Sequence, residues 1–196
     1  MGGLAGALVM FAGDMLFYGQ WASGAAAYSD SMSIVDSRPV WVLMLGGLLG
    51  PLAGIGYLSG LLHIVERVRP AGRVLQALVV FGLLAVFSVA VATHSVWGAL
   101  AVATEARPEV GAYLELFFLI GQIIAVPVAL LLFGITVLGR TGWPRGTAAV
   151  NPGLVYLALV TATWLPSPVG AVIVGGAFNL AFAAFFAVSL ATDRDG

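Results

Sequence analysis

The sequence predicts an all-α polytopic membrane protein, in which residues 1–196 form a single transmembrane domain folded as a six-helix bundle. Composition is the first reason. The chain is 61% hydrophobic and 9% charged, with a mean hydropathy of +1.05, whereas a soluble domain is roughly 45–50% apolar and 25% charged. A soluble protein of this size cannot bury so much apolar surface, so the bilayer is the expected solvent.

Segment length is the second reason, because six apolar runs follow one another between charged, proline or glycine residues. A spanning helix needs about 17–25 apolar residues. The fifth run is the weakest, since Asn151-Pro152-Gly153 opens it and Pro166-Ser167-Pro168 closes it. A five-helix arrangement with this run re-entrant is therefore an alternative. The expected helices comprise residues 2–21, 39–65, 74–103, 112–139, 150–165 and 167–190.

The third reason is the uneven distribution of arginine between the loops. All eight basic residues are arginine, and six of them fall in the second loop, the fourth loop and the tail. The two groups are Arg67, Arg69, Arg73, Arg140, Arg145 and Arg194 on one side, against Arg38 and Arg107 on the other. The positive-inside rule then predicts cytoplasmic N- and C-termini in a multi-pass protein of the inner (plasma) membrane.

The second helix carries a ridge of small residues. Gly46, Gly50 and Gly54 recur at four-residue spacing, and Pro51 interrupts the backbone hydrogen bonds between them. Small residues let membrane helices approach closely, and proline bends a helix. The ridge predicts a close helix contact, either within the bundle or between copies in a homo-oligomer.

Two function classes are excluded by composition. The absence of cysteine excludes disulfides, thiolate metal sites and cysteine nucleophiles. A net charge of −1 leaves no footprint for nucleic acid. We expect no metal and no cofactor, because His63 and His94 are predicted to lie in opposite halves of the membrane. Glu66 with Arg67 and Arg69 is interpreted as an interfacial charge group, and His63 as its amphipathic neighbour. The alternative is that His63 and Glu66, three residues apart on one face, form a hydrogen-bonded pair or two metal ligands.

Asp14 is the residue around which a site is expected. It lies within an apolar run, where an aspartate at the helix centre costs about 2.5–3.5 kcal/mol in insertion scales. Such residues usually face the protein interior and mark a site or a pathway. On a helix Tyr18 lies one turn from Asp14 and Trp21 about two turns from it, on the same face.

Three further helices bring polar groups to a similar depth. His94 comes late in the third helix, with Trp97 one turn on, and Asn179 lies near the middle of the sixth. Glu115 begins the fourth helix, and Gln122 lies roughly 10 Å deeper on the same face. Glu115 reaching out to the surface, and Asn179 forming a plain interhelical hydrogen bond, are the alternatives. The predicted site has Asp14, His94 and Glu115 as catalytic residues and Tyr18, Trp21, Trp97, Gln122 and Asn179 as substrate-binding residues.

Several short motifs resemble a family of uncharacterised bacterial six-helix membrane proteins of about this length. They are Gly13-Asp14-Met15-Leu16-Phe17-Tyr18-Gly19, the pair Gly46-Gly47 with Gly50-Pro51 and His63, and Asn151-Pro152-Gly153. The resemblance extends over most of the chain. It implies a six-helix architecture and assigns no catalytic residue.

The leading functional hypothesis is an enzyme that binds an apolar small molecule and acts by acid–base chemistry on a lipidic or isoprenoid substrate, as isomerases and cyclases do. A carboxyl group beside aromatic faces can protonate an alkene, and those faces stabilise the resulting cation. The alternative is a small transporter or a proton or cation channel using the same groups. A non-catalytic subunit for membrane assembly or sensing is the third hypothesis. Membrane lipids are the expected partners in each case.

Overall fold

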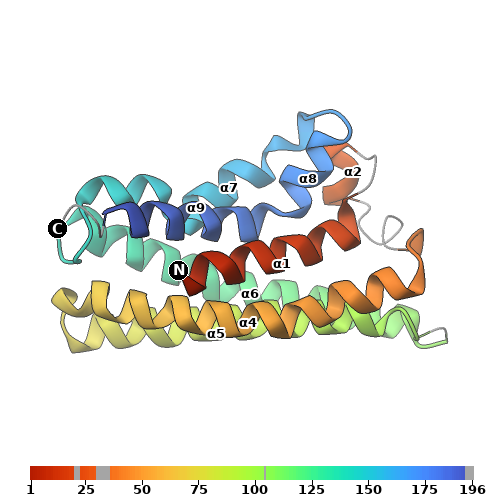
Figure 1. Ribbon diagram of the computed structural model, residues 1–196, viewed down its shortest axis with the longest axis horizontal. Coiled ribbons are helices and arrows are strands. Elements are labelled where there is room, and N and C mark those ends of the chain that lie inside the picture. The colour runs from red at the N-terminus through yellow and green to blue at the C-terminus, as the bar shows by residue number, and fades with distance from the viewer. Residues whose placement is uncertain (20–22, 30–35, 104, 193–196) are drawn as a thin grey trace.

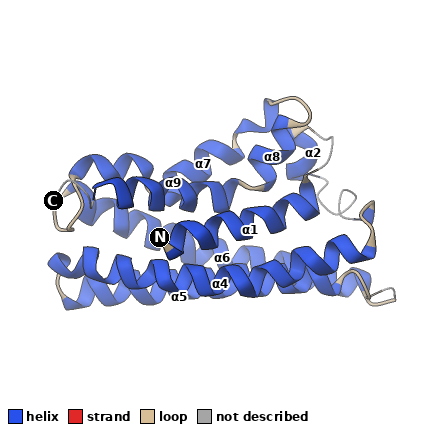
Figure 2. Cartoon of the chain, in the orientation of Figure 1, coloured by secondary structure: helices blue, strands red, loops and turns tan. Residues whose placement is uncertain are grey.

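The computed structural model describes residues 1–19, 23–29, 36–103 and 105–192 (Figure 1). Within these residues every regular element is a helix, and none is a strand (Figure 2). The α-helices are α1 (Gly2–Tyr18), α2 (Gly24–Ser29), α4 (Val40–Val68), α5 (Arg73–Ala99), α6 (Arg107–Val137), α7 (Pro152–Val160), α8 (Val169–Gly175) and α9 (Ala177–Thr192). Short 3-10 turns are η1 (Arg69–Ala71), η2 (Arg145–Val150) and η3 (Ala162–Trp164).

Among the residues that the structure describes, three helices are long and apolar enough to cross a membrane: Val40–Ala71, Arg73–Ala99 and Pro108–Val137. The bent pair α8 and α9 would make a fourth span. Length and composition therefore identify a membrane protein. Helices α4 and α6 continue through Pro51 and Pro127, so neither proline ends its helix.

The C-terminal third differs from the two continuous helices expected there. Residues 150–165 form α7, which begins at Pro152 and ends at Val160, and then the 3-10 turn η3. Residues 167–190 are divided into α8 and α9, whose axes differ by 73°. The break lies at Gly175-Gly176, where a Cβ added to the first would stand 2.8 Å from Tyr18 Cβ and one added to the second would overlap the Phe11 ring. These glycines let the bend press closely against α1.

The bundle has two ends, which we name by residues. At the Trp97 end, α1 and α5 finish and α4 and α6 begin. At the Arg73 end, α4 and α6 finish and α5 begins. Figure 1 shows α4 and α5 side by side along the whole length, with α1 and α9 above them and α6 behind.

Glycines bring α1 and α5 close to α4. A Cβ on Gly47 would lie 2.7 Å from Gly98 Cα of α5, and one on Gly56 would lie 2.5 Å from Gly6 Cα of α1. The ridge residues Gly46, Gly50 and Gly54 are likewise covered by side chains of α1 and α5. The chain itself therefore covers the ridge, and these glycines serve helix contacts within the bundle.

Candidate functional site

Asp14 of α1 and His94 of α5 are in direct contact in the interior. His94 Nε2 lies 3.1 Å from Asp14 Oδ1. Each residue is only 6% exposed. A carboxyl group buried in an apolar bundle is costly unless it is hydrogen-bonded, and the imidazole provides one of its partners.

The other carboxyl oxygen is held from α9 and, through α9, from α4. Asn179 Nδ2 donates to Asp14 Oδ2 at 2.6 Å, and the Tyr57 hydroxyl donates to Asn179 Oδ1 at 2.5 Å. Asn179 and Tyr57 are buried as well. Four helices therefore meet in one hydrogen-bonded chain of Tyr57, Asn179, Asp14 and His94.

The directions of these hydrogen bonds locate one labile proton. His94 Nδ1 lies 3.4 Å from the Gly46 carbonyl oxygen, which can only accept, so this contact is a hydrogen bond in the tautomer that has the hydrogen on Nδ1, and we assign that tautomer. Asp14 Oδ2 accepts from Asn179, so the remaining proton of the pair lies between Asp14 Oδ1 and His94 Nε2. The pair is either a neutral acid beside a neutral base or a carboxylate beside an imidazolium. In both forms it holds a single transferable proton.

Two glycines make room for the His94 side chain, and a third faces its ring through a carbonyl. A Cβ on Gly13 would stand 3.0 Å from His94 Cε1, and one on Gly50 would stand 2.5 Å from His94 Cβ. Gly46 supplies the carbonyl that faces Nδ1. Glycines on α1 and on α4 therefore leave the space in which the His94 side chain lies beside Asp14.

The Asp14–His94 pair opens into a cavity of about 380 Å³. Helices α1, α5, α6, α7, α8 and α9 all contribute to its wall. On α5 the lining extends from Leu83 to Trp97, which is about 21 Å at 1.5 Å per residue. Most of the wall is apolar, and the polar side chains are Asp14, Tyr18, Thr93, His94, Gln122, Tyr156 and Asn179. The cavity suits an elongated apolar molecule with few polar atoms.

Aromatic rings surround the pair and the cavity. The Phe17 ring lies 5.3 Å from the His94 ring and 5.9 Å from the Trp97 ring, and the Tyr18 and Trp97 rings meet edge to face at 5.8 Å. Rings that line the cavity come from Tyr18, Trp97, Phe117, Phe118, Tyr156, Phe178 and Phe182. Their faces can stabilise a positive charge that develops on a bound molecule.

The other predicted site residues are divided between cavity and surface. Tyr18, Trp97, Gln122 and Asn179 line the cavity. Glu115 is exposed on α6 and does not line it, which places it outside the site. Its position near the start of α6 lets the carboxylate remain outside the packed interior. Trp21 lies outside the described residues.

Tyr57 is the member of the network that sequence reasoning missed. It is fully buried in α4 and stacks on Phe87 with a ring separation of 4.4 Å. A tyrosine in the middle of an apolar helix brings a hydroxyl that needs a partner. That requirement is the feature of the sequence that points to Tyr57 as a member of the network.

Aromatic packing closes the interior between the Asp14–His94 pair and the Arg73 end. Neighbouring rings follow one another from Tyr57 to Trp143, with centroid separations from 4.4 to 6.2 Å: Tyr57, Phe87, Phe182, Phe186, Phe185 and Trp143. Beyond them Ser189 contacts His63 Nε2 at 2.7 Å and accepts a hydrogen bond from Trp143 Nε1 at 2.6 Å. In the described part of the chain these rings separate this second cluster from Asn179. Phe185, Phe186 and Trp143 do not line the cavity, so its described lining ends before this second cluster.

The described residues contain no group of three histidine, cysteine or acidic side chains that could hold a metal ion. The chemistry that the pair itself can perform is proton transfer by its own side chains. Comparison of the chain with protein-family models, with curated proteins and with solved structures finds no match.

Proposed function

We propose that this protein is a membrane enzyme that takes a lipidic or isoprenoid molecule into the cavity and moves a proton on it with Asp14 and His94. One observation carries the proposal: a buried carboxyl–imidazole pair, joined at 3.1 Å, borders a largely apolar cavity of about 380 Å³. Apolar walls select a hydrocarbon ligand, and the Asp14–His94 pair supplies an acid and a base at one point along the cavity.

The proposal includes a six-segment arrangement in the membrane. Helices α1, α4, α5 and α6 would each cross it, α7 with η3 would form the fifth segment, and α8 with α9 the sixth. With the Arg73 end cytoplasmic, the arginine distribution follows the positive-inside rule. The Asp14–His94 pair then lies in the outer half, where a lipid of the outer leaflet has the shorter path to it.

Helix α6 provides the path from the bilayer. It packs mainly on α5, and its apolar side chains Leu119, Ile123 and Val126 are each more than half exposed. Phe117 and Phe118 of α6 line the cavity, as do Val160 of α7 and Val174 of α8. A hydrophobic substrate would enter sideways between α6 and these two helices.

The reaction that fits is a shift of a carbon–carbon double bond. Asp14 Oδ1 would give its proton to an alkene carbon, leaving a carboxylate and a cation on the substrate. Loss of a proton from a neighbouring carbon to the carboxylate or to His94 Nε2 would form the new double bond and restore the pair. The step consumes no oxidant or reductant, and the aromatic wall would stabilise the intermediate charge.

Transport is the second candidate, because the 73° break between α8 and α9 lies beside Tyr18 and close to Asn179. Broken helices that meet a buried polar site occur in secondary transporters. The aromatic packing from Tyr57 to Trp143 weighs against it, since a transport path would have to open there.

Deuterium exchange separates the two candidates. Membranes containing the protein are incubated in D₂O, and their lipids are analysed by mass spectrometry. The enzyme proposal predicts that one lipid fraction gains carbon-bound deuterium with the wild-type protein and not with Asp14→Asn. Glu115→Gln is the matched control, because it removes an exposed carboxylate of the same chain and should leave the exchange unchanged.

The contrary results are equally definite. Equal deuterium content in lipids exposed to wild type and to Asp14→Asn would contradict the enzyme proposal. Asp14-dependent acidification of the lumen of proteoliposomes, without lipid exchange, would favour transport in its place.

A further inference from the structure

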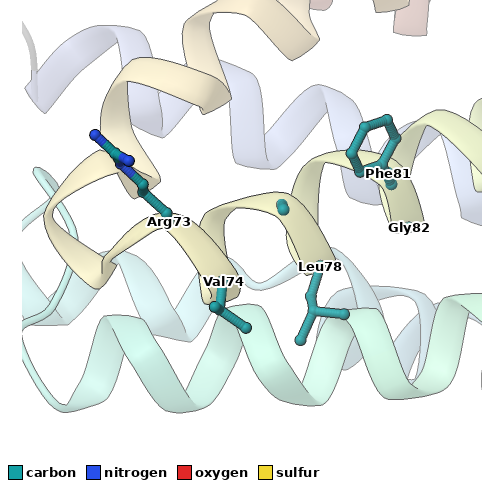
Figure 3. Close-up of a pocket in the computed structure, with 6 residues that line it drawn as sticks. Arg73, Val74, Leu78, Phe81 and Gly82 are labelled. Carbon is teal, nitrogen blue, oxygen red and sulfur yellow. The ribbon is translucent and has the colours of Figure 1, made fainter.

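A second hollow on the molecule lies far from the Asp14–His94 pair, at the start of α5. It is a shallow hollow, largely open to the surroundings along the surface of α5, and is lined by Arg73, Val74, Ala77, Leu78, Phe81 and Gly82. Figure 3 shows Arg73 and Phe81 directed to one side of α5, and Val74 and Leu78, which lie between them along the helix, directed to the other. None of these residues lines the Asp14 cavity. We call this surface the Arg73 groove.

The walls of the Arg73 groove are apolar and uncovered. Val74 is 73% exposed, Leu78 55% and Phe81 69%. From Val74 to Phe81 the groove extends about 10 Å along the helix axis, at 1.5 Å per residue. In a bilayer, the hydrocarbon chains of lipids cover an apolar strip of this kind wherever no protein packs on it.

The end of the groove at which Arg73 lies is positively charged. Arg67, Arg69, Arg140 and Arg145 lie at the same end of the bundle, and Glu66 is the acid that accompanies them in the described part of the chain. Glu66 lies 3.9 Å from Arg69. Arg140 donates to the Ala71 carbonyl and Arg67 to the Gly142 carbonyl, so both are held near the surface. The excess of positive charge is complementary to an anionic headgroup.

We propose that the Arg73 groove binds an anionic phospholipid, with the phosphate at Arg73 and one acyl chain along Val74, Leu78 and Phe81. An arginine matches the geometry of a phosphate through paired N–H donors. Each basic residue near a membrane surface contributes enough attraction to an anionic lipid for about a fivefold change in affinity. The groove adds shape to this attraction, so one lipid would be retained when the bulk lipid is removed.

Native mass spectrometry tests the proposal on the full-length protein. The protein is reconstituted in nanodiscs of phosphatidylcholine with phosphatidylglycerol, released into detergent, and weighed with its bound lipids. We expect the wild type to retain one phosphatidylglycerol in preference to phosphatidylcholine. Arg73→Gln should reduce that retention by about tenfold or more, because it removes the charge-assisted hydrogen bonds to the phosphate as well as the general surface attraction, and Arg73→Lys should restore part of it.

The matched control is Arg69→Gln, which removes the same charge from the same end but does not line the groove. It should reduce phosphatidylglycerol retention by no more than about fivefold, which is the general attraction that any arginine near the surface contributes, and by less than Arg73→Gln does. Equal loss in both variants would overturn the proposal in favour of diffuse attraction. Equal retention of phosphatidylcholine and phosphatidylglycerol by the wild type would also overturn it. Arg73 is exposed, so its replacement should leave the melting temperature unchanged.

Discussion

Replacing Asp14 by asparagine should abolish proton transfer and leave the protein folded. The oxygen of the introduced amide would accept the hydrogen bond from Asn179, in the place of Asp14 Oδ2. The nitrogen of that amide would donate to His94 Nε2, whose lone pair is free because Nδ1 carries the hydrogen that faces Gly46. Every hydrogen bond of the network is retained, and only the labile proton is lost.

Asp14→Ala is the comparison that gives this prediction a magnitude. It removes both oxygens, leaving the Asn179 amide and His94 Nε2 without partners in a buried site. Each unsatisfied buried group costs about 1–3 kcal/mol, so Asp14→Ala should lower the free energy of unfolding by about 2–6 kcal/mol. Asp14→Asn should change it by less than about 1 kcal/mol.

The free energies are measured by unfolding in mixed detergent micelles, followed by tryptophan fluorescence. Trp97 is a suitable reporter because it is buried near the pair. The assignment of hydrogen-bond directions would be refuted if Asp14→Asn destabilised the protein as much as Asp14→Ala. In that case the simplest explanation is that the oxygen of the introduced amide faces His94 Nε2. Nε2 would then be a hydrogen-bond donor and not an acceptor.

Three further predictions follow from packing, from the network and from topology. Gly50→Ala places a Cβ 2.5 Å from His94 Cβ and should lower the free energy of unfolding by about 1–3 kcal/mol. In the same unfolding assay Gly134→Ala, whose added Cβ meets nothing within 4 Å, should be neutral or stabilising. Equal effects of the two substitutions would show that α4 does not pack tightly against His94. Tyr57→Phe removes the hydroxyl that donates to Asn179 and should lower the free energy of unfolding by about 1–3 kcal/mol. It should slow lipid deuterium exchange less than Asp14→Asn does. A complete loss of exchange would show that the Tyr57 hydroxyl takes part in the chemistry. Because the chain has no cysteine, Glu105→Cys should react with an impermeant maleimide from outside the cell and Arg69→Cys only after permeabilisation, and the reverse pattern would invert the orientation.

The class of protein and the positions of its polar residues along the helices were predictable from the sequence. Apolar composition and long uncharged runs indicate the bilayer directly, and three long apolar helices confirm the membrane assignment. Asp14 was conspicuous because a carboxyl group in an apolar run must have a partner. The glycines of α4 indicated close packing, and the structure shows that this packing seats His94.

Rotation of each helix about its axis was decided only by the tertiary structure. Sequence gives depth, at 1.5 Å per residue, but the lipid and the protein interior are both apolar, so hydropathy does not distinguish a lipid-facing side from a buried one. For this reason Asp14, His94 and Asn179 could be assigned a similar depth but not a contact, the choice between a buried and an exposed Glu115 stayed open, and Tyr57 was missed. The broken helices α7 to α9 also depend on tertiary contacts, because Gly175 and Gly176 end α8 where the chain must fit closely against Tyr18 and Phe11 of α1.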